Sequence, residues 1–290
     1  MKNRKKQLLF LLVIVAVLFM ATGCSSPVDP ETKEIIQITS DTTFKYMMQN
    51  ENWFNALFVF PLAKAVNFMA PKMGVTLAIA IVTLLVHGIT MIFTIKSTVM
   101  TQKMQVIQPE MARIQKKYEG KTDERSQMAQ AQEMQRLYKE HGINPFGAII
   151  SSFIQLPIIM AVYMSVQRAE SVVNGTLWGL SLKTTPLQGI MSGQFLYLAI
   201  FAFMAICQIL SMKLPQILSE KKAKKEAELH HRKYEKTKQP GGNTMIFMMV
   251  FILIISISWP TAMTVYWIVS SLVMILKTVL VQFVYIEKKK

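Results

Sequence analysis

The chain has 290 residues, 52% of them hydrophobic, and its 32 Lys and Arg outnumber 17 Asp and Glu to give a formal net charge of +15. This composition is too apolar for an ordinary soluble domain, so we expect lipid to surround much of the chain. The two cysteines, Cys24 and Cys207, are too few for a disulfide framework. We therefore expect no redox chemistry.

Residues 1–23 have the order of a signal peptide, with four basic residues followed by an apolar stretch that is short for a membrane span. The sequence Ala21-Thr22-Gly23-Cys24 resembles the lipobox of bacterial lipoproteins, although Leu is usual where Ala21 stands. This predicts cleavage before Cys24, acylation of Cys24 with a fatty acid such as palmitate, and an extracellular lipidated tether over 24–52. The alternative is an ordinary signal anchor with an incidental cysteine.

Apolar runs that suit helices of about 20 residues follow at 75–95, 146–166 and 195–212, and a longer run at 244–284 is interrupted by Trp259-Pro260. We interpret the longer run as two helices joined by a tight turn. The sequence thus predicts an all-α integral membrane protein with five transmembrane helices, a core over 74–284 and a basic tail over 285–290. Residues 53–73 predict an interfacial helix rather than a sixth span, because Pro61 and Lys64 interrupt the run.

Basic residues concentrate in the segments at 96–144 and 213–243 and in the tail, whereas 167–194 carries only Arg168 and Lys183. The positive-inside rule therefore places these basic segments in the cytoplasm. With five spans, the N-terminus lies outside and the C-terminus inside, in agreement with the lipobox. We expect a multi-pass protein of the bacterial cell membrane.

Polar residues recur on one face of the first span, among them Thr83, His87 and Thr90. Polar residues in three further spans, including Gln155, Gln208 and Trp267, indicate a common polar interior. The alternative is that each Ser and Thr bonds its own helix and only cements packing. We interpret His87 as the ionisable residue well inside a span, where it is either a neutral imidazole or a partly charged group in a hydrated groove.

Residues 98–141 predict a cytoplasmic helical hairpin. Its first helix carries an apolar stripe with three- and four-residue gaps, which includes Met104 and Met111. Gly120 is expected to end this helix, and Thr122 or Asp123 to cap a second one, on which Met128 and Met134 share a face. The four Met side chains either contact client proteins, because Met suits adaptable surfaces, or face the opposite helix of the hairpin.

The basic loop predicted at 213–243 and the Lys288-Lys289-Lys290 tail indicate contact with anionic lipid, or with phosphates of ribosomal RNA without base reading. His230-His231 is a lone pair with no further ligands at suitable spacing, so we expect no metal site.

Several motifs resemble the YidC family of bacterial membrane protein insertases, in the short Gram-positive lipoprotein form. Asn144-Pro145-Phe146-Gly147 precedes Ile154-Gln155-Leu156-Pro157-Ile158 and Ala161-Val162-Tyr163. Further matches, in the family's order, are Trp53-Phe54, Pro61-Leu62, Gln108-Pro109-Glu110-Met111, Trp178, Lys213-Leu214, Pro260 and Tyr266-Trp267. The resemblance covers nearly the whole chain from about residue 50.

The resemblance implies a hydrophilic groove, open to the cytoplasm and to lipid, in which a polar segment of a nascent membrane protein rests during insertion. It implies a chaperone-like insertase that works alone or with the Sec translocon and contacts the ribosome through its basic loop and tail. We expect no enzyme activity, no cofactor and no DNA partner. His87, Thr83, Thr90, Gln155, Gln208 and Trp267 would line the groove.

One position departs from the family pattern. The first span of the family usually carries an Arg in the groove, whereas this chain has Val86-His87-Gly88. The electrostatic attraction of acidic client segments thus depends on the charge of His87.

Two other classes of membrane protein require features of their own. A small-solute or proton-coupled transporter or channel would need ionisable groups across the bilayer and usually an internal repeat. A membrane protease would need a metal cluster or a nucleophile with its base. The predicted hairpin favours the insertase over both.

Overall fold

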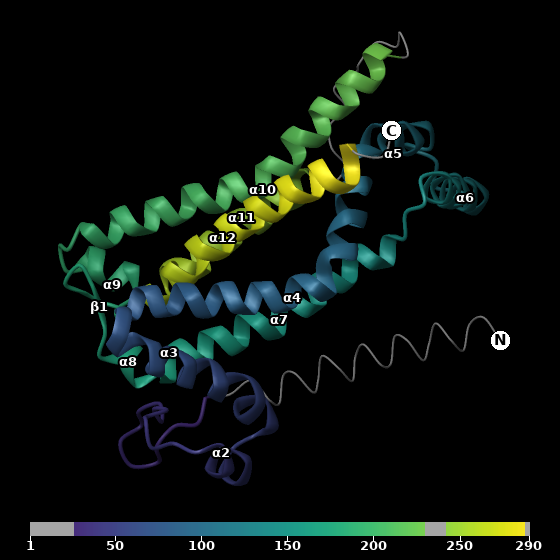
Figure 1. The fold of residues 1–290 in the computed structure, drawn as a ribbon. Helices are drawn as coiled ribbons and strands as arrows, with labels where there is room; N and C mark the ends of the chain where they lie inside the picture. The colour runs from purple at the N-terminus through teal and green to yellow at the C-terminus, as the bar shows by residue number, and fades with distance from the viewer. Residues whose placement is uncertain (1–25, 230–241, 288–290) are drawn as a thin grey trace. The chain divides into compact units, whose positions relative to one another are not determined.

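The computed structural model describes residues 26–229 and 242–287, and nearly all regular structure in them is helical (Figure 1). The elements are α2 (Phe44–Asn50), the π-helix η1 (Asn55–Val59), α3 (Phe60–Met73), α4 (Val75–Val106), α5 (Gln108–Lys117), α6 (Glu124–Glu140), α7 (Pro145–Arg168), α8 (Glu170–Val173), β1 (Thr176–Leu177), β2 (Leu180–Ser181), α9 (Pro186–Met191), α10 (Leu196–Leu229), α11 (Gly242–Ile257), α12 (Thr261–Val281) and the π-helix η2 (Gln282–Glu287). The chain forms two compact units, and several long helices contribute to both. Unit 1 comprises 1–82, 154–197 and 260–265, and unit 2 comprises 83–153, 198–259 and 266–290.

In unit 1, the segment before α2 is folded onto the rest of the unit. Residues Val28 and Ile35 form an antiparallel bridge, and Ile38 forms a parallel bridge with Ala169 next to the end of α7. Ile38 is fully buried. The sequence interpretation expected a polar tether over 24–52, whereas the described part of this segment has a fixed place in unit 1.

A buried ion pair holds this segment. The guanidinium of Arg168 is almost fully enclosed and bonds both carboxylate oxygens of Glu51, at 2.7 and 2.5 Å. The Nε of Arg168 also donates to the carbonyl oxygen of Ile36 at 2.8 Å. A buried guanidinium requires a carboxylate and hydrogen-bond acceptors as partners. The need for these partners explains why a polar segment packs against the end of an apolar helix.

The connection between α8 and α9 in unit 1 is a short β-hairpin. β1 and β2 pair antiparallel, with Leu177 opposite Leu180. The two turn residues, Trp178 and Gly179, have φ angles of 50° and 82°, the left-handed conformation that a tight two-residue hairpin turn requires. The Trp178 side chain is exposed.

Three helices in the described part of the chain are long and apolar enough to cross a membrane: Val75–Val106, Leu196–Lys222 and Thr261–Tyr285. They agree with three of the five predicted spans. The other two predicted spans correspond to α7, with 24 residues, and α11, with 16. The tight turn expected at Trp259-Pro260 is confirmed, because α11 ends at Ile257 and α12 begins at Thr261.

Two boundaries differ from the sequence interpretation. The apolar stripe beginning at Met104 was expected on one helix, but α4 ends at Val106 and α5 begins at Gln108. Pro109 lies in the first turn of α5, where its missing N–H costs no intrahelical hydrogen bond. In the basic segment at 213–243, residues up to Leu229 continue α10 as a helix rather than forming a loop.

The turn between α5 and α6 contains the glycine and the capping residue expected from the sequence. Gly120 has a φ of 78°, and the Asp123 carboxylate accepts a hydrogen bond from the backbone N–H of Ser126 at the start of α6. Hydrogen bonding by Ser126, from its side chain first and from this backbone N–H second, lowers the pKa of Asp123.

Candidate functional site

The candidate site in unit 2 is a line of polar contacts between α4 and α12. His87 Nε2 lies 2.9 Å from Ser270 Oγ, and Lys277 Nζ donates to Thr94 Oγ1 at 2.9 Å. Further along, Gln102 Nε2 donates to the carbonyl oxygen of Thr278 at 3.1 Å. We call these six residues the polar seam.

The contacts of the polar seam define the direction of the two helices. From His87 to Thr94 and from Ser270 to Lys277 the chain advances by seven residues, or two helical turns, on both helices. Helices α4 and α12 therefore run parallel (Figure 1).

Aromatic side chains surround the His87 end of the polar seam. The rings of His87 and Tyr266 stack with centroids 6.3 Å apart, and Tyr266 meets Trp267 edge-on at 5.7 Å. Trp267 Nε1 is buried and has no hydrogen-bond partner among the described residues. Such a donor, enclosed without an acceptor, is costly unless a water or a bound segment satisfies it.

Gln208 connects α10 to the same region. Its side-chain oxygen accepts a hydrogen bond of 2.7 Å from Ser271 Oγ, which neighbours Ser270 of the polar seam. Both partners are buried. The structure thus brings Gln208, His87 and Trp267 to one stretch of α12.

The remaining predicted groove residues are placed differently. Thr83 is buried on α4. Thr90 donates to the His87 carbonyl of its own helix at 3.2 Å, the local bond that the sequence interpretation left open as an alternative. Gln155 belongs to unit 1 and is half-buried.

Lys277 is a second ionisable residue inside a span, in addition to His87, and the sequence analysis does not name it. The lysine lies in α12, within the candidate span Thr261–Tyr285. A seven-residue spacing from Ser270 was the available signal, because it puts both residues on one helix face.

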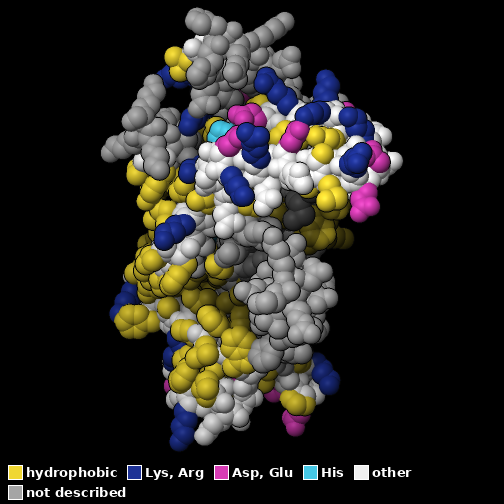
Figure 2. All heavy atoms as spheres, turned by 90° about the vertical axis from the view of Figure 1, so that its right-hand side faces the viewer, with side chains coloured by type: hydrophobic (Ala, Val, Ile, Leu, Met, Phe, Trp, Pro, Cys, Tyr) yellow, Lys and Arg dark blue, Asp and Glu magenta, His cyan; other side chains and the backbone are white. Residues whose placement is uncertain are grey.

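The Met side chains of the predicted hairpin divide into two groups. Met104, Met111 and Met134 pack against a core of Ile107, Leu137 and Ile143, whereas Met128 is 57% exposed. Figure 2 shows the side of the molecule that carries α5 and α6, where charged side chains gather around these elements. A role for the four Met residues in client contact stays a prediction.

An ion pair links α5 and α6 at their surface. Glu133 Oε1 accepts from Lys117 Nζ at 2.5 Å and from the hydroxyl of Tyr118 at 2.9 Å. These hydrogen bonds, the one from Lys117 first, lower the pKa of Glu133, and the bond to Glu133 raises the pKa of Lys117.

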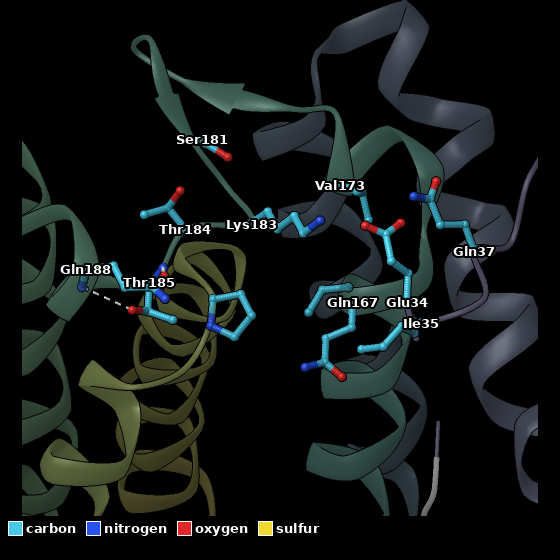
Figure 3. A pocket seen from close by; sticks show the side chains of 12 residues that line it. Glu34, Ile35, Gln37, Gln167, Val173, Ser181, Lys183, Thr184, Thr185 and Gln188 are labelled. Atoms are coloured by element: carbon cyan, nitrogen blue, oxygen red, sulfur yellow. Dashed lines mark hydrogen bonds between the residues drawn. The ribbon is translucent and has the colours of Figure 1, made fainter. Parts of the chain in front are cut away.

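Unit 1 contains a separate polar cavity of about 520 Å³, shown in Figure 3. Its walls come from the segment before α2, from α7 and α8, and from the residues between β2 and α9. Glu34 and Lys183 point toward one another from opposite walls (Figure 3), but both side chains are largely exposed to solvent.

Some predicted sites lie outside the described residues, namely the lipidation site Cys24, the pair His230-His231 and the tail lysines 288–290. Within 26–229 and 242–287, no three His, Cys, Asp or Glu side chains are grouped so that they could hold a metal ion.

Apolar helices of membrane-spanning length with hydrogen bonds between their polar side chains define an α-helical integral membrane protein. Residues 68–289 match the family described as 60Kd inner membrane protein, and the chain belongs to that family.

Its relatives carry names that agree with this family. The chain is 33% identical over 265 residues to the membrane protein insertase YidC of Mycoplasma capricolum, covering 89% of this chain and 68% of the relative. It is 28% identical over 272 residues to the membrane protein insertase YidC 2 of Bacillus anthracis, covering 92% and 90%. It is 26% identical over 288 residues to the membrane protein insertase MisCA of Bacillus subtilis, covering 98% and 94%. The resemblance found from the motifs is confirmed, and these names support a role in membrane protein insertion.

Proposed function

We propose that the chain is an insertase and folding helper for membrane proteins and lipoproteins, with the polar seam and Gln208 lining a hydrophilic groove open to the cytoplasm. The observation that carries this proposal is the pair of contacts His87 to Ser270 and Gln208 to Ser271, which gather polar groups from three helices of a membrane protein.

The groove would act by lowering the cost of moving polar groups through hydrocarbon. A charged residue at the centre of a bilayer costs at least about 2.5–3.5 kcal/mol. Hydroxyl, amide and imidazole groups can replace part of the water that such a residue loses. The client's own apolar helix, once it enters lipid, supplies the driving force, so no nucleotide is required.

Unpaired polar atoms support a site that receives a client segment. Trp267 Nε1 and Gln102 Oε1 are buried without a partner in the described part of the chain. A polypeptide that enters the groove offers both a carbonyl acceptor and an N–H donor at every non-proline residue.

The partners follow from the same assignment. Nascent membrane proteins are the clients, and they first bind near α5 and α6, where Met128 is exposed for contact. The Sec translocon is a partner in insertion. The basic segment from Lys213 onward and the tail contact the ribosome and anionic lipid. An acylated Cys24 anchors the N-terminus outside the bacterial cell membrane.

The test is reconstitution. The full chain is purified into liposomes, a single-span test protein is synthesised in their presence, and protease protection measures its insertion. We expect protection to exceed that of empty liposomes at least about tenfold, as for a barrier lowered by about 1.4 kcal/mol. Insertion no better than in empty liposomes would refute the proposal, and proton leakage without insertion would favour a transporter.

Matched variants sharpen the result. Combining His87→Leu, Ser270→Ala and Gln208→Leu removes polar groups from the groove and should abolish most of the gain. Combining Thr98→Val and Thr101→Val removes hydroxyls that bond only their own helix and should leave insertion unchanged. Equal losses in both variants would contradict a specific role for the groove.

A further inference from the structure

We infer that Lys277, on the cytoplasmic side of His87 within the polar seam, is the residue that captures acidic segments of client proteins. This inference rests on the proposed function, and it assigns the attraction of carboxylates to Lys277 rather than to His87. The ligand class is an extended peptide segment that carries Asp or Glu.

Lys277 is placed along α12 where a client from the cytoplasm would arrive before it reaches His87. It lies 16 residues after Thr261, which corresponds to about 24 Å of helix. His87 and Ser270 lie two turns, or about 10 Å, deeper along the same parallel pair of helices. With the C-terminus of α12 inside the cell, Lys277 lies nearer the cytoplasm than His87.

The side chain of Lys277 is turned toward α4. A lysine near the end of a membrane helix ordinarily extends its ammonium group to the interface. Here the ammonium donates to Thr94 Oγ1, whose own hydrogen is used toward the Thr90 carbonyl oxygen at 2.8 Å. Thr94 is therefore a pure acceptor for Lys277, and an ammonium has two more hydrogens to donate.

The charge of Lys277 is not balanced within the site. The sequence has no Asp or Glu over 75–109, 196–219 and 242–286. Among the described residues, no carboxylate lies within ion-pair distance of Lys277 Nζ. An ammonium with only a hydroxyl partner in a region of low dielectric attracts an anion strongly.

Unused acceptors lie further along α4, where Gln102 comes eight residues, or about 12 Å of helix, after Thr94, the partner of Lys277. Gln102 is 95% buried, and while its amide nitrogen bonds the Thr278 carbonyl, its side-chain oxygen has no partner among the described residues. Gln105 Oε1, further along α4, and Gln108 Oε1, at the first residue of α5, are also buried without a partner among the described residues. These oxygens can accept from backbone N–H groups of a peptide whose carboxylate meets Lys277.

The test compares two clients that differ only in charge. A single-span test protein carries a translocated tail with three Asp, or with three Asn in the same places. Both are inserted by full-length protein in liposomes, and the readout is the ratio of acidic to neutral insertion, which cancels general loss of activity.

Four proteins are compared with the wild type. Lys277→Met and Lys277→Gln remove the charge, Lys277→Arg keeps it, and Lys96→Met removes a charge from an exposed side chain of α4. We expect the ratio to fall at least about tenfold in Lys277→Met and Lys277→Gln, and to stay within about twofold of wild type in the other two, as for loss of one desolvated ion pair.

An unchanged ratio in Lys277→Gln would overturn the inference, as would an equal fall in Lys96→Met. Failure of the wild-type protein to insert the neutral client would instead refute the proposed function, so the two failures are distinguishable.

Discussion

His87 finds its hydrogen-bond partner on a helix almost two hundred residues further along the chain. The bond to Ser270 joins α4 to α12 at 2.9 Å, and the stacked Tyr266 ring closes one side of the imidazole. Because the partners are held by helix packing, the bond should contribute to the stability of unit 2 as well as to the proposed groove.

A double-mutant cycle measures that contribution. His87→Ala, Ser270→Ala and the double variant are unfolded in mixed micelles, and the coupling free energy is calculated from the three changes. We expect a coupling of about 0.6 kcal/mol, and at most about 1.7, as for hydrogen bonds between membrane helices. Thr101→Val paired with Ser270→Ala is the control, and should show no coupling because Thr101 bonds only its own helix.

Arg168 allows a second prediction at the level of single residues. Arg168→Ala leaves Glu51 buried without its partner and should lower the free energy of unfolding by about 3–5 kcal/mol. Limited proteolysis of residues 26–52 detects the release of this segment. The double variant Arg168→Met with Glu51→Leu should regain most of the protection.

An exposed pair provides the matched control for Arg168. Arg136 and Glu140 are paired on the surface of α6, with side chains that are mostly in solvent. Arg136→Ala should not change the proteolysis pattern, because exposed ion pairs contribute little. A pattern unaltered in Arg168→Ala as well would contradict a structural role for the buried pair.

The residues of the site were only partly predictable from the sequence. The periodicity of α4 indicated that His87 and Thr83 share a face, which is a local property of one helix. Which side chains of α12 contact that face depends on how α12 is rotated and shifted against α4. A periodic pattern within one helix does not determine this packing. Lys277 is one charge in a long apolar run; its spacing from Ser270 gives their common helix face, but only the contact with Thr94 shows that this face meets α4.

At the level of elements, α5 and α6 form a pair held by an apolar core and one surface ion pair. Leu137 and Ile107 lie in that core, while Glu133 bonds Lys117 and Tyr118 at the edge. This arrangement makes the pair sensitive to pH in a defined direction.

The pKa of Glu133 is lowered in the folded chain, mainly by the hydrogen bond from Lys117. Its stabilising contribution is therefore complete above the ordinary pKa of a glutamate and is lost as the pH falls through the lowered value. We expect the protection of amides in α5 and α6 against hydrogen exchange, relative to their intrinsic rate at each pH, to fall a few-fold at most below about pH 4, because the pair is exposed. Glu133→Gln should remove this dependence, and an unchanged dependence would assign it to other carboxylates.

The sequence predicted the two helices of this pair but not where the first one begins. The apolar stripe from Met104 continues with the same period across Ile107, so periodicity gives no sign of a break. The break depends on the N–H that Pro109 lacks, and proline is equally compatible with a helix start and with a kink. The start of α6 was easier to predict, because Asp123 is a capping residue at the expected place.

At the level of the whole molecule, the parallel direction of α4 and α12 has a topological consequence. Two parallel helices that both cross the bilayer have their C-terminal ends on the same side. The basic residues that follow α4 and α12 then lie on one side, which agrees with five crossings and a cytoplasmic C-terminus. The count of five stays a prediction, because α11 has only 16 residues.

Cysteine labelling tests this topology. In a Cys207→Ala background, Trp178→Cys should react with a membrane-impermeant maleimide added to intact cells, and Met128→Cys only after the cells are opened. Both positions are exposed, so access to the reagent depends on the side of the membrane. Labelling of Met128→Cys in intact cells would contradict the orientation.

The central claim is that this chain inserts membrane proteins, and depletion of a bacterium's own insertase tests it most directly. The full chain is supplied in its place, and growth and insertion of a single-span test protein are scored. We expect the wild-type chain to restore both, and the combined His87→Leu, Ser270→Ala and Gln208→Leu variant to restore neither at the same membrane abundance. Absence of rescue by the wild-type chain, despite good membrane expression, would contradict the claim.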